Sequence, residues 1–142
     1  MLFLPDAFNE LNKQISGDFY VGGWTAANHW GLLDDLAFDT FVFCIQPQND
    51  LPSDIVVKVT KPFLLFGIAK LGRHTSISDI HKCVIDAMMY PDMFGGNDML
   101  AILTDAYLSH PDRDFGILKS YAKKTMDARI AMAVGEICGE NQ

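Results

Sequence analysis

The chain has 142 residues, of which 49% are hydrophobic and 20% charged, and its formal net charge is -7. This length predicts one domain, 1–142, and the composition supplies enough apolar side chains for a core. The apolar runs are too short to cross a bilayer, and residues 1–5 lack the basic flank of a signal peptide. The three cysteines are widely spaced and odd in number, which is typical of reduced thiols, so we expect a cytoplasmic protein.

The first half of the chain predicts one or two helices and then a run of strands. Apolar residues at helical spacing predict a helix over 6–15, and a short helix is expected over 24–30. The β-branched and aromatic run 40–45 predicts a buried strand. Residues 54–60 precede Pro62 and are expected at a sheet edge. A third apolar run covers 63–68, and a more polar strand is expected over 73–77.

The second half predicts four helices. Apolar residues with amphipathic spacing predict a helix over 79–90, with Ser78 or Asp79 as its N-cap. Further helices are expected to begin with Asn97 as a cap, after Asp112 or Asp114, and near 127. Strands followed by helices favour the α+β class. We therefore expect a small mixed sheet of about three to five strands packed with about five to six helices, and a helical C-terminal half.

The charge is distributed unevenly along the chain. Residues 1–54 contain eight acids and one base, whereas the segment 55–78 contains no acid. The four bases of that segment, Lys58, Lys61, Lys70 and Arg73, could contact another macromolecule. A sheet edge protected by lysines would explain the same residues. Because the net charge opposes binding to phosphates, we expect weak or no binding to duplex DNA at physiological salt.

No catalytic pattern is present in the sequence. Nucleotidyltransferases need an Asp-x-Asp pair on a strand, and Asp112-x-Asp114 follows Pro111 in an expected loop instead. Nucleases of the restriction type need an acid two residues before a lysine, and no lysine here has one. The histidines and cysteines lack the spacing of zinc ligands. We expect no catalytic residues, no cofactor and no metal, and so no enzyme.

Two segments carry a more specific pattern. The first, 18–32, reads D-F-Y-V-G-G-W-T-A-A-N-H-W-G-L: an aromatic approach, a Gly22-Gly23 turn, and a small-residue helix that lies between Trp24 and Trp30 and ends at Gly31. The second, 74–96, combines a polar strand, an apolar helix with an internal acid, a proline and a Gly-Gly pair. The residues that define this second pattern are Ser78, Asp79, Lys82, Asp86, Pro91, Gly95 and Gly96. We expect Asp86 to be structural, since it can accept hydrogen bonds or pair with a base beside the apolar stripe.

In this order, the two segments resemble the AbiEi-type antitoxin and transcriptional-regulator family of abortive-infection, type IV toxin–antitoxin systems. The resemblance covers roughly residues 15–138. It implies a non-enzymatic regulatory or antitoxin module of phage defence, with a nucleotidyltransferase-like toxin as its genetic partner. Family members usually bind DNA through an N-terminal winged helix. Residues 1–17 allow only one helix, so we expect this chain to correspond to the C-terminal α+β domain, without DNA-reading residues.

A second interpretation does not depend on the resemblance. The acidic N-terminal third could give a protein-interaction or oligomerisation domain an acidic face for a basic partner. Both interpretations expect no membrane association, and both allow a homo-oligomer. Both also expect the two tryptophans to lie mostly buried, because indole rings contribute large apolar areas to a core.

Overall fold

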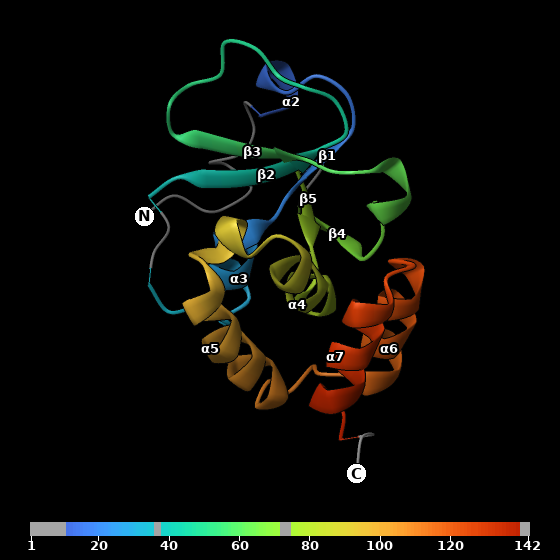
Figure 1. Cartoon of the computed structure of the whole chain (residues 1–142). Helices are drawn as coiled ribbons and strands as arrows, with labels where there is room; N and C mark the ends of the chain where they lie inside the picture. The colour runs from blue at the N-terminus through green and yellow to red at the C-terminus, as the bar shows by residue number, and fades with distance from the viewer. Residues whose placement is uncertain (1–10, 36–37, 72–74, 140–142) are drawn as a thin grey trace.

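The computed structural model describes residues 11–35, 38–71 and 75–139 (Figure 1). A five-stranded sheet lies above a layer of helices in this view, and α2 lies on the opposite side of β3 from that layer. The first half contains, in chain order, α2 (Leu11–Gln14), β1 (Phe19–Val21), α3 (Gly23–His29), β2 (Thr40–Cys44), β3 (Ile55–Val59), the 3-10 turn η1 (Pro62–Leu64), β4 (Ile68–Leu71) and β5 (Thr75–Ser78). The second half contains α4 (Ile80–Met89), the 3-10 turn η2 (Pro91–Phe94), α5 (Asn97–Leu108), α6 (Phe115–Lys124) and α7 (Ala128–Ile137).

The sheet is mixed, and its strand order is β3-β2-β1-β5-β4. β1 pairs antiparallel with β2 and parallel with β5, while β3 runs parallel to β2 and β4 antiparallel to β5. The expected α+β fold with a small mixed sheet and a helical C-terminal half is confirmed. The expected edge strand 54–60 is also confirmed, because β3 ends the sheet on one side.

One strand was not predicted, and one predicted strand was wrong. The central strand β1 was not predicted, because its three residues are too few to display an alternating pattern. The apolar run 63–68 does not form one strand: it begins in the η1 turn, where Pro62 occupies the first position, and only Ile68 belongs to β4. The predicted helix 6–15 and strand 73–77 begin outside the described residues, and their described parts coincide with α2 and β5.

The helices of the second half begin close to their predicted positions. The carboxylates of Asp79, Asp114 and Asp127 accept hydrogen bonds from backbone N–H groups in the first turns of α4, α6 and α7. Helix α5 differs from the prediction, since Gly96 occupies the cap position and Asn97 is already helical, without a side-chain cap. Gly96 has φ +100, a conformation that asparagine adopts less readily than glycine.

The core lies between the sheet and helices α3 and α4. Tyr20 of β1 stacks on Phe43 of β2, with ring centroids 5.1 Å apart, and Tyr90 packs on Phe43 from the end of α4. Helix α4 is buried along almost its whole length, since α5, α6 and α7 all contact it on the side away from the sheet. This central helix positions the polar groups described next.

Candidate functional site

The two motif segments meet in space. Trp30, at the end of α3, donates a hydrogen bond from its indole Nε1 to the backbone oxygen of Ser78, at 2.7 Å. Trp24 donates from its Nε1 to the backbone oxygen of Asp35, at 2.9 Å. Both tryptophan side chains are mostly buried, which confirms the expectation from the sequence. Segments about fifty residues apart in the chain thus form one structural unit.

Glycines allow the two segments to approach closely. Gly23 has φ +55, and a Cβ atom there would lie 2.6 Å from the backbone oxygen of Met93 in the second segment. A Cβ atom on Gly95 would lie 3.1 Å from the ring of Trp24 in the first segment. Both positions therefore need glycine for space as well as for backbone conformation.

Gly31 ends α3, as predicted, and it does so in a Schellman motif. It has φ +80, its N–H donates to the oxygen of Asn28, and the N–H of Leu32 donates to the oxygen of Ala27. Leu32 is buried beyond the turn. This pair of bonds satisfies carbonyl groups that the helix end would otherwise leave without a donor.

A buried ion pair occupies the middle of α4. The ammonium Nζ of Lys82 lies 3.1 Å from Oδ1 of Asp86, one helical turn later, and the two side chains are 0% and 1% exposed. Tyr20 of β1 donates its hydroxyl to Oδ2 of Asp86 at 2.7 Å, and Lys82 donates to the backbone oxygen of Leu64 at 2.6 Å. The ammonium also lies 4.2 Å from the ring centroid of Phe66. We call Tyr20, Lys82 and Asp86 the buried triad.

Burial dominates the ionisation of the triad. It raises the pKa of Asp86, while the Lys82 ammonium and the Tyr20 hydroxyl oppose this shift. Burial, followed by the charge of Asp86, raises the pKa of Tyr20. Because these groups are enclosed and satisfy one another, a substrate could not reach them without opening the core. The geometry supports a structural role, in which Lys82 and Asp86 hold β1 and the 62–67 turn against α4.

A second polar cluster joins α4 to α5 and α6. His81 makes a 2.8 Å hydrogen bond between its Nδ1 and the hydroxyl of Tyr107, and that hydroxyl also contacts the backbone of Asp114. Tyr121 donates its hydroxyl to Oδ2 of Asp79 at 2.7 Å. Asp79 therefore caps α4 with one oxygen and holds α6 with the other.

We expect His81 to make the free energy of unfolding depend on pH. Burial lowers its pKa from the usual 6.5, although Asp79 and Asp114 oppose the shift. As the pH falls, the imidazole of His81 is therefore protonated in the unfolded chain before it is protonated in the folded protein. The stabilisation of the folded state is present above the unfolded pKa of 6.5 and is lost as the pH falls below it. We expect the free energy of unfolding to fall between about pH 7.5 and about pH 5.5, and to fall less in His81→Gln. Urea titrations at the two pH values measure both changes.

His29 provides the control for this prediction. Burial lowers its pKa also, but it lies on the surface, edge-on to Trp30. His29→Asn should retain most of the acid-induced loss. An equal loss in wild-type protein and His81→Gln would contradict the assignment.

The structure separates the predicted basic residues. Lys58 on β3 and Lys70 on β4 lie on opposite edges of the sheet, because three strands lie between them. Lys58 forms a 2.7 Å ion pair with Asp92, and Lys70 donates to the hydroxyl of Ser76. Lys61 is exposed before η1, and Arg73 lies outside the described residues. Both lysines therefore lie on edge strands, which agrees with the sheet-edge interpretation, and they do not lie side by side in one basic strip.

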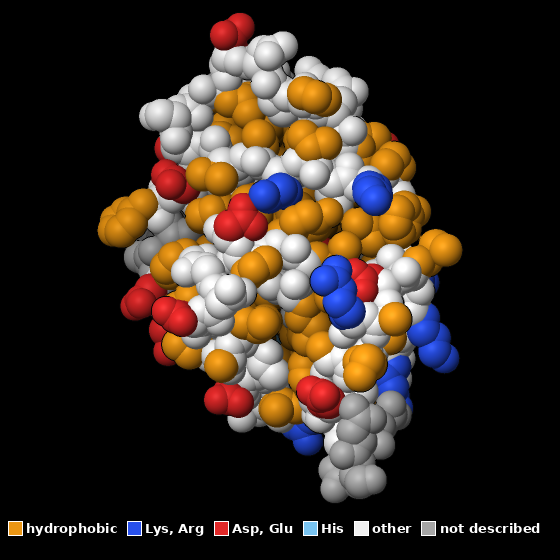
Figure 2. Space-filling model, in the orientation of Figure 1, with side chains coloured by type: hydrophobic (Ala, Val, Ile, Leu, Met, Phe, Trp, Pro, Cys, Tyr) orange, Lys and Arg blue, Asp and Glu red, His pale blue; other side chains and the backbone are white. Residues whose placement is uncertain are grey.

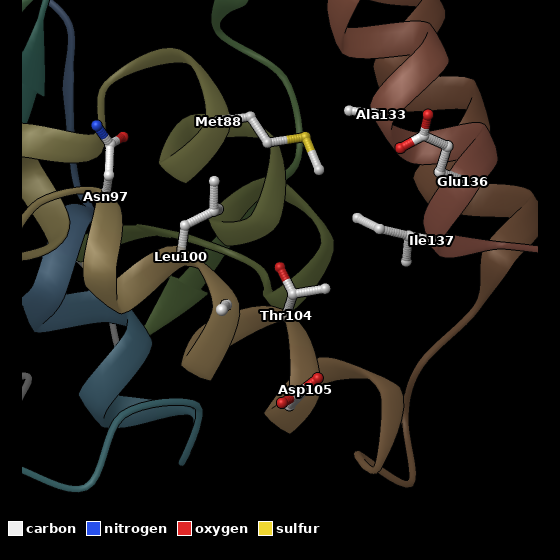
Figure 3. A pocket seen from close by; sticks show the side chains of 9 residues that line it. Met88, Asn97, Leu100, Thr104, Asp105, Ala133, Glu136 and Ile137 are labelled. Carbon is white, nitrogen blue, oxygen red and sulfur yellow. The ribbon is translucent and has the colours of Figure 1, made fainter.

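An open groove lies between α5 and α7, with Met88 of α4 at its base. Its two adjoining parts have volumes of about 440 and 540 Å³ and share Met88, Leu100 and Ala133. Hydrophobic side chains are visible between the two helices, and acidic side chains flank their lower ends (Figure 2). In the close view, Leu100 and Thr104 point into the groove from α5, and Ile137 points into it from α7 (Figure 3). We call this the α5–α7 groove.

Sequence reasoning missed Tyr20 and His81 as members of polar clusters, and it missed the groove. Tyr20 meets Asp86 across 66 residues of sequence, and no local pattern indicates such a contact. The Lys82–Asp86 spacing was a usable signal, since residues four apart lie on the same face of a helix. The groove depends on how far α5 and α7 diverge, which their amphipathic patterns do not specify.

Within the described ranges, no helix is long and apolar enough to cross a membrane. Residues 11–35, 38–71 and 75–139 also contain no group of three or more acidic, histidine or cysteine side chains suited to hold a metal ion. Compared with models of protein families and with curated proteins, the chain matches none.

Proposed function

We propose that this chain is a cytoplasmic, non-enzymatic regulatory domain of the antitoxin kind, acting through contact with another macromolecule in a phage-defence toxin–antitoxin system. The observation that carries the proposal is the 2.7 Å bond from Trp30 to Ser78, which joins the two motif segments. The residues that resemble the AbiEi-type family thus belong to one unit, as expected if they were selected together to specify one fold.

The location of the ionisable groups supports contact in preference to catalysis. The strongly buried pair, Lys82 and Asp86, is committed to internal bonds, whereas a catalytic acid or base must reach a substrate. The α5–α7 groove is open, and its lining is more apolar than polar, so it is a described surface that a partner could bind.

Growth rescue tests the proposal. The chain and the product of its neighbouring gene would be expressed from separate inducible promoters. We expect the neighbouring product to arrest growth and the chain to restore colony formation. The negative control is Gly23→Val, whose added side chain would clash with the backbone of Met93 and disrupt the fold, and its abundance is measured alongside. Arrest that persists despite abundant, folded chain would contradict an antitoxin role.

A further inference from the structure

Two exposed acids line the α5–α7 groove at different levels (Figure 3). Asp105 lies in the last turn of α5 and Glu136 in the last turn of α7, on the two walls of the groove. Both side chains belong to exposed residues, and neither has an ion-pair partner among the residues the structure describes.

These two acids add to the charge of the helix ends. The C-terminal end of a helix carries a partial negative charge, which acids there reinforce and bases neutralise. Neither α5 nor α7 has a basic residue in its last turn, whereas α6 ends with Lys123 and Lys124. Both walls of this part of the groove therefore carry a carboxylate near a helix end that has no basic residue in its last turn, which favours a cation on either wall.

The other end of the groove is different. Asp127 lies there beside Arg129, and their side chains approach to 3.4 Å, so the two charges largely neutralise each other. Between the ends, the lining is mainly apolar, with Met88, Leu100 and Ile137 on three different helices. Methionine adapts its shape to a partner's side chains more readily than branched residues do.

We propose that the α5–α7 groove binds an amphipathic helix of a partner protein. The partner's apolar side chains would lie on Met88, Leu100 and Ile137, and its lysines or arginines would lie beside Asp105 on one wall and Glu136 on the other. This inference rests on the proposed function, and it specifies the kind of partner surface that the groove would bind. An open groove between two helices suits a third helix, which is a common mode of peptide recognition. A second copy of this chain is disfavoured, because each copy carries a net charge of -7.

Peptide binding tests this inference. The probe is a fluorescein-labelled, stapled helix of about 14 residues with leucines on one face and two lysines near one end. A matched peptide carries glutamates in place of the lysines. Fluorescence anisotropy at about 150 mM salt measures both affinities. We expect the lysine peptide to bind, and to bind at least about tenfold more tightly than the glutamate peptide.

Variants of the chain locate the site. Asp105→Lys combined with Glu136→Lys should weaken binding of the lysine peptide by about tenfold or more. The control, Asp18→Lys combined with Asp54→Lys, changes the net charge equally at exposed acids outside the groove and should leave the affinity within about twofold. Ala101→Trp places a large ring at an exposed lining position and should block binding without altering charge. Urea titrations establish that each variant is folded.

Several results would overturn the inference: equal affinity for the two peptides, or unchanged affinity in both groove variants. If the chain self-associates and Ala101→Trp abolishes this, the groove binds a second copy of the chain. If free leucine amide binds as tightly as the lysine peptide, the groove binds a small cation. Growth rescue separates this inference from the proposed function. If the variant Asp105→Lys with Glu136→Lys still restores growth, the groove has no part in the function. If the wild-type chain does not restore growth, the antitoxin role is wrong, and the peptide measurements alone decide whether the groove binds a helix.

Discussion

Replacing Lys82 with methionine is expected to lower the free energy of unfolding by about 3–5 kcal/mol. The change leaves Asp86 inside the core without its ammonium partner, at a position that is 1% exposed. It also removes the donor to the Leu64 backbone oxygen and so frees the 62–67 turn. Urea unfolding followed by tryptophan fluorescence measures the loss.

A triple variant separates the loss of one partner from the loss of the whole network. Tyr20→Phe, Lys82→Met and Asp86→Leu together remove both charges and the hydroxyl while keeping similar volumes. Apolar replacement of a buried ion pair is often neutral or stabilising, so we expect the triple variant to recover to within about 2 kcal/mol of wild type. A triple variant less stable than Lys82→Met would show that the network itself stabilises the fold.

Replacing Gly23 with alanine is expected to lower the free energy of unfolding by about 2–5 kcal/mol. Its φ of +55 is unfavourable for a residue with a side chain. The new methyl group would also lie 2.6 Å from the backbone oxygen of Met93 and 2.8 Å from Cβ of Phe41, so α3 or η2 must shift. Thermal and urea unfolding measure the effect.

Gly31 offers a matched control. It has φ +80, but a Cβ atom there meets nothing within 4 Å. Gly31→Ala should therefore show only the conformational cost, about 1–2 kcal/mol. Equal losses for the two variants would contradict the close approach of the two motif segments at Gly23.

The sequence predicted those parts of the fold that local patterns encode. The helix over 79–90, the caps at Asp79 and Asp114, and the end of α3 at Gly31 follow from side chains close to one another in the chain. Strand β1 was missed because it is short and gains its stability from pairing with β2 and β5, which are distant in sequence. Its position at the centre of the sheet is a tertiary property that three residues cannot display.

The candidate site was predictable only in part. The prediction that Asp86 can pair with a base is confirmed, because Asp86 forms an ion pair with Lys82. The complete burial of that pair was not predictable, because it depends on β1, the 62–67 turn and the helices α3, α5, α6 and α7 packing around α4. The basic residues were predictable in part: Lys58 and Lys70 lie on edge strands, as the sheet-edge interpretation expected, but the strand order places them on opposite edges of the sheet.

We propose that the buried triad has a structural role only and that the domain acts through its surface. The decisive measurement is growth rescue by the triple variant Tyr20→Phe, Lys82→Met, Asp86→Leu, with chain abundance and unfolding followed in parallel. We expect the folded triple variant to restore growth as well as wild type does, and Asp86→Asn to lower the melting temperature without abolishing rescue wherever it remains folded. A triple variant that is folded and abundant but fails to restore growth would contradict the claim and assign the triad a direct part in the activity.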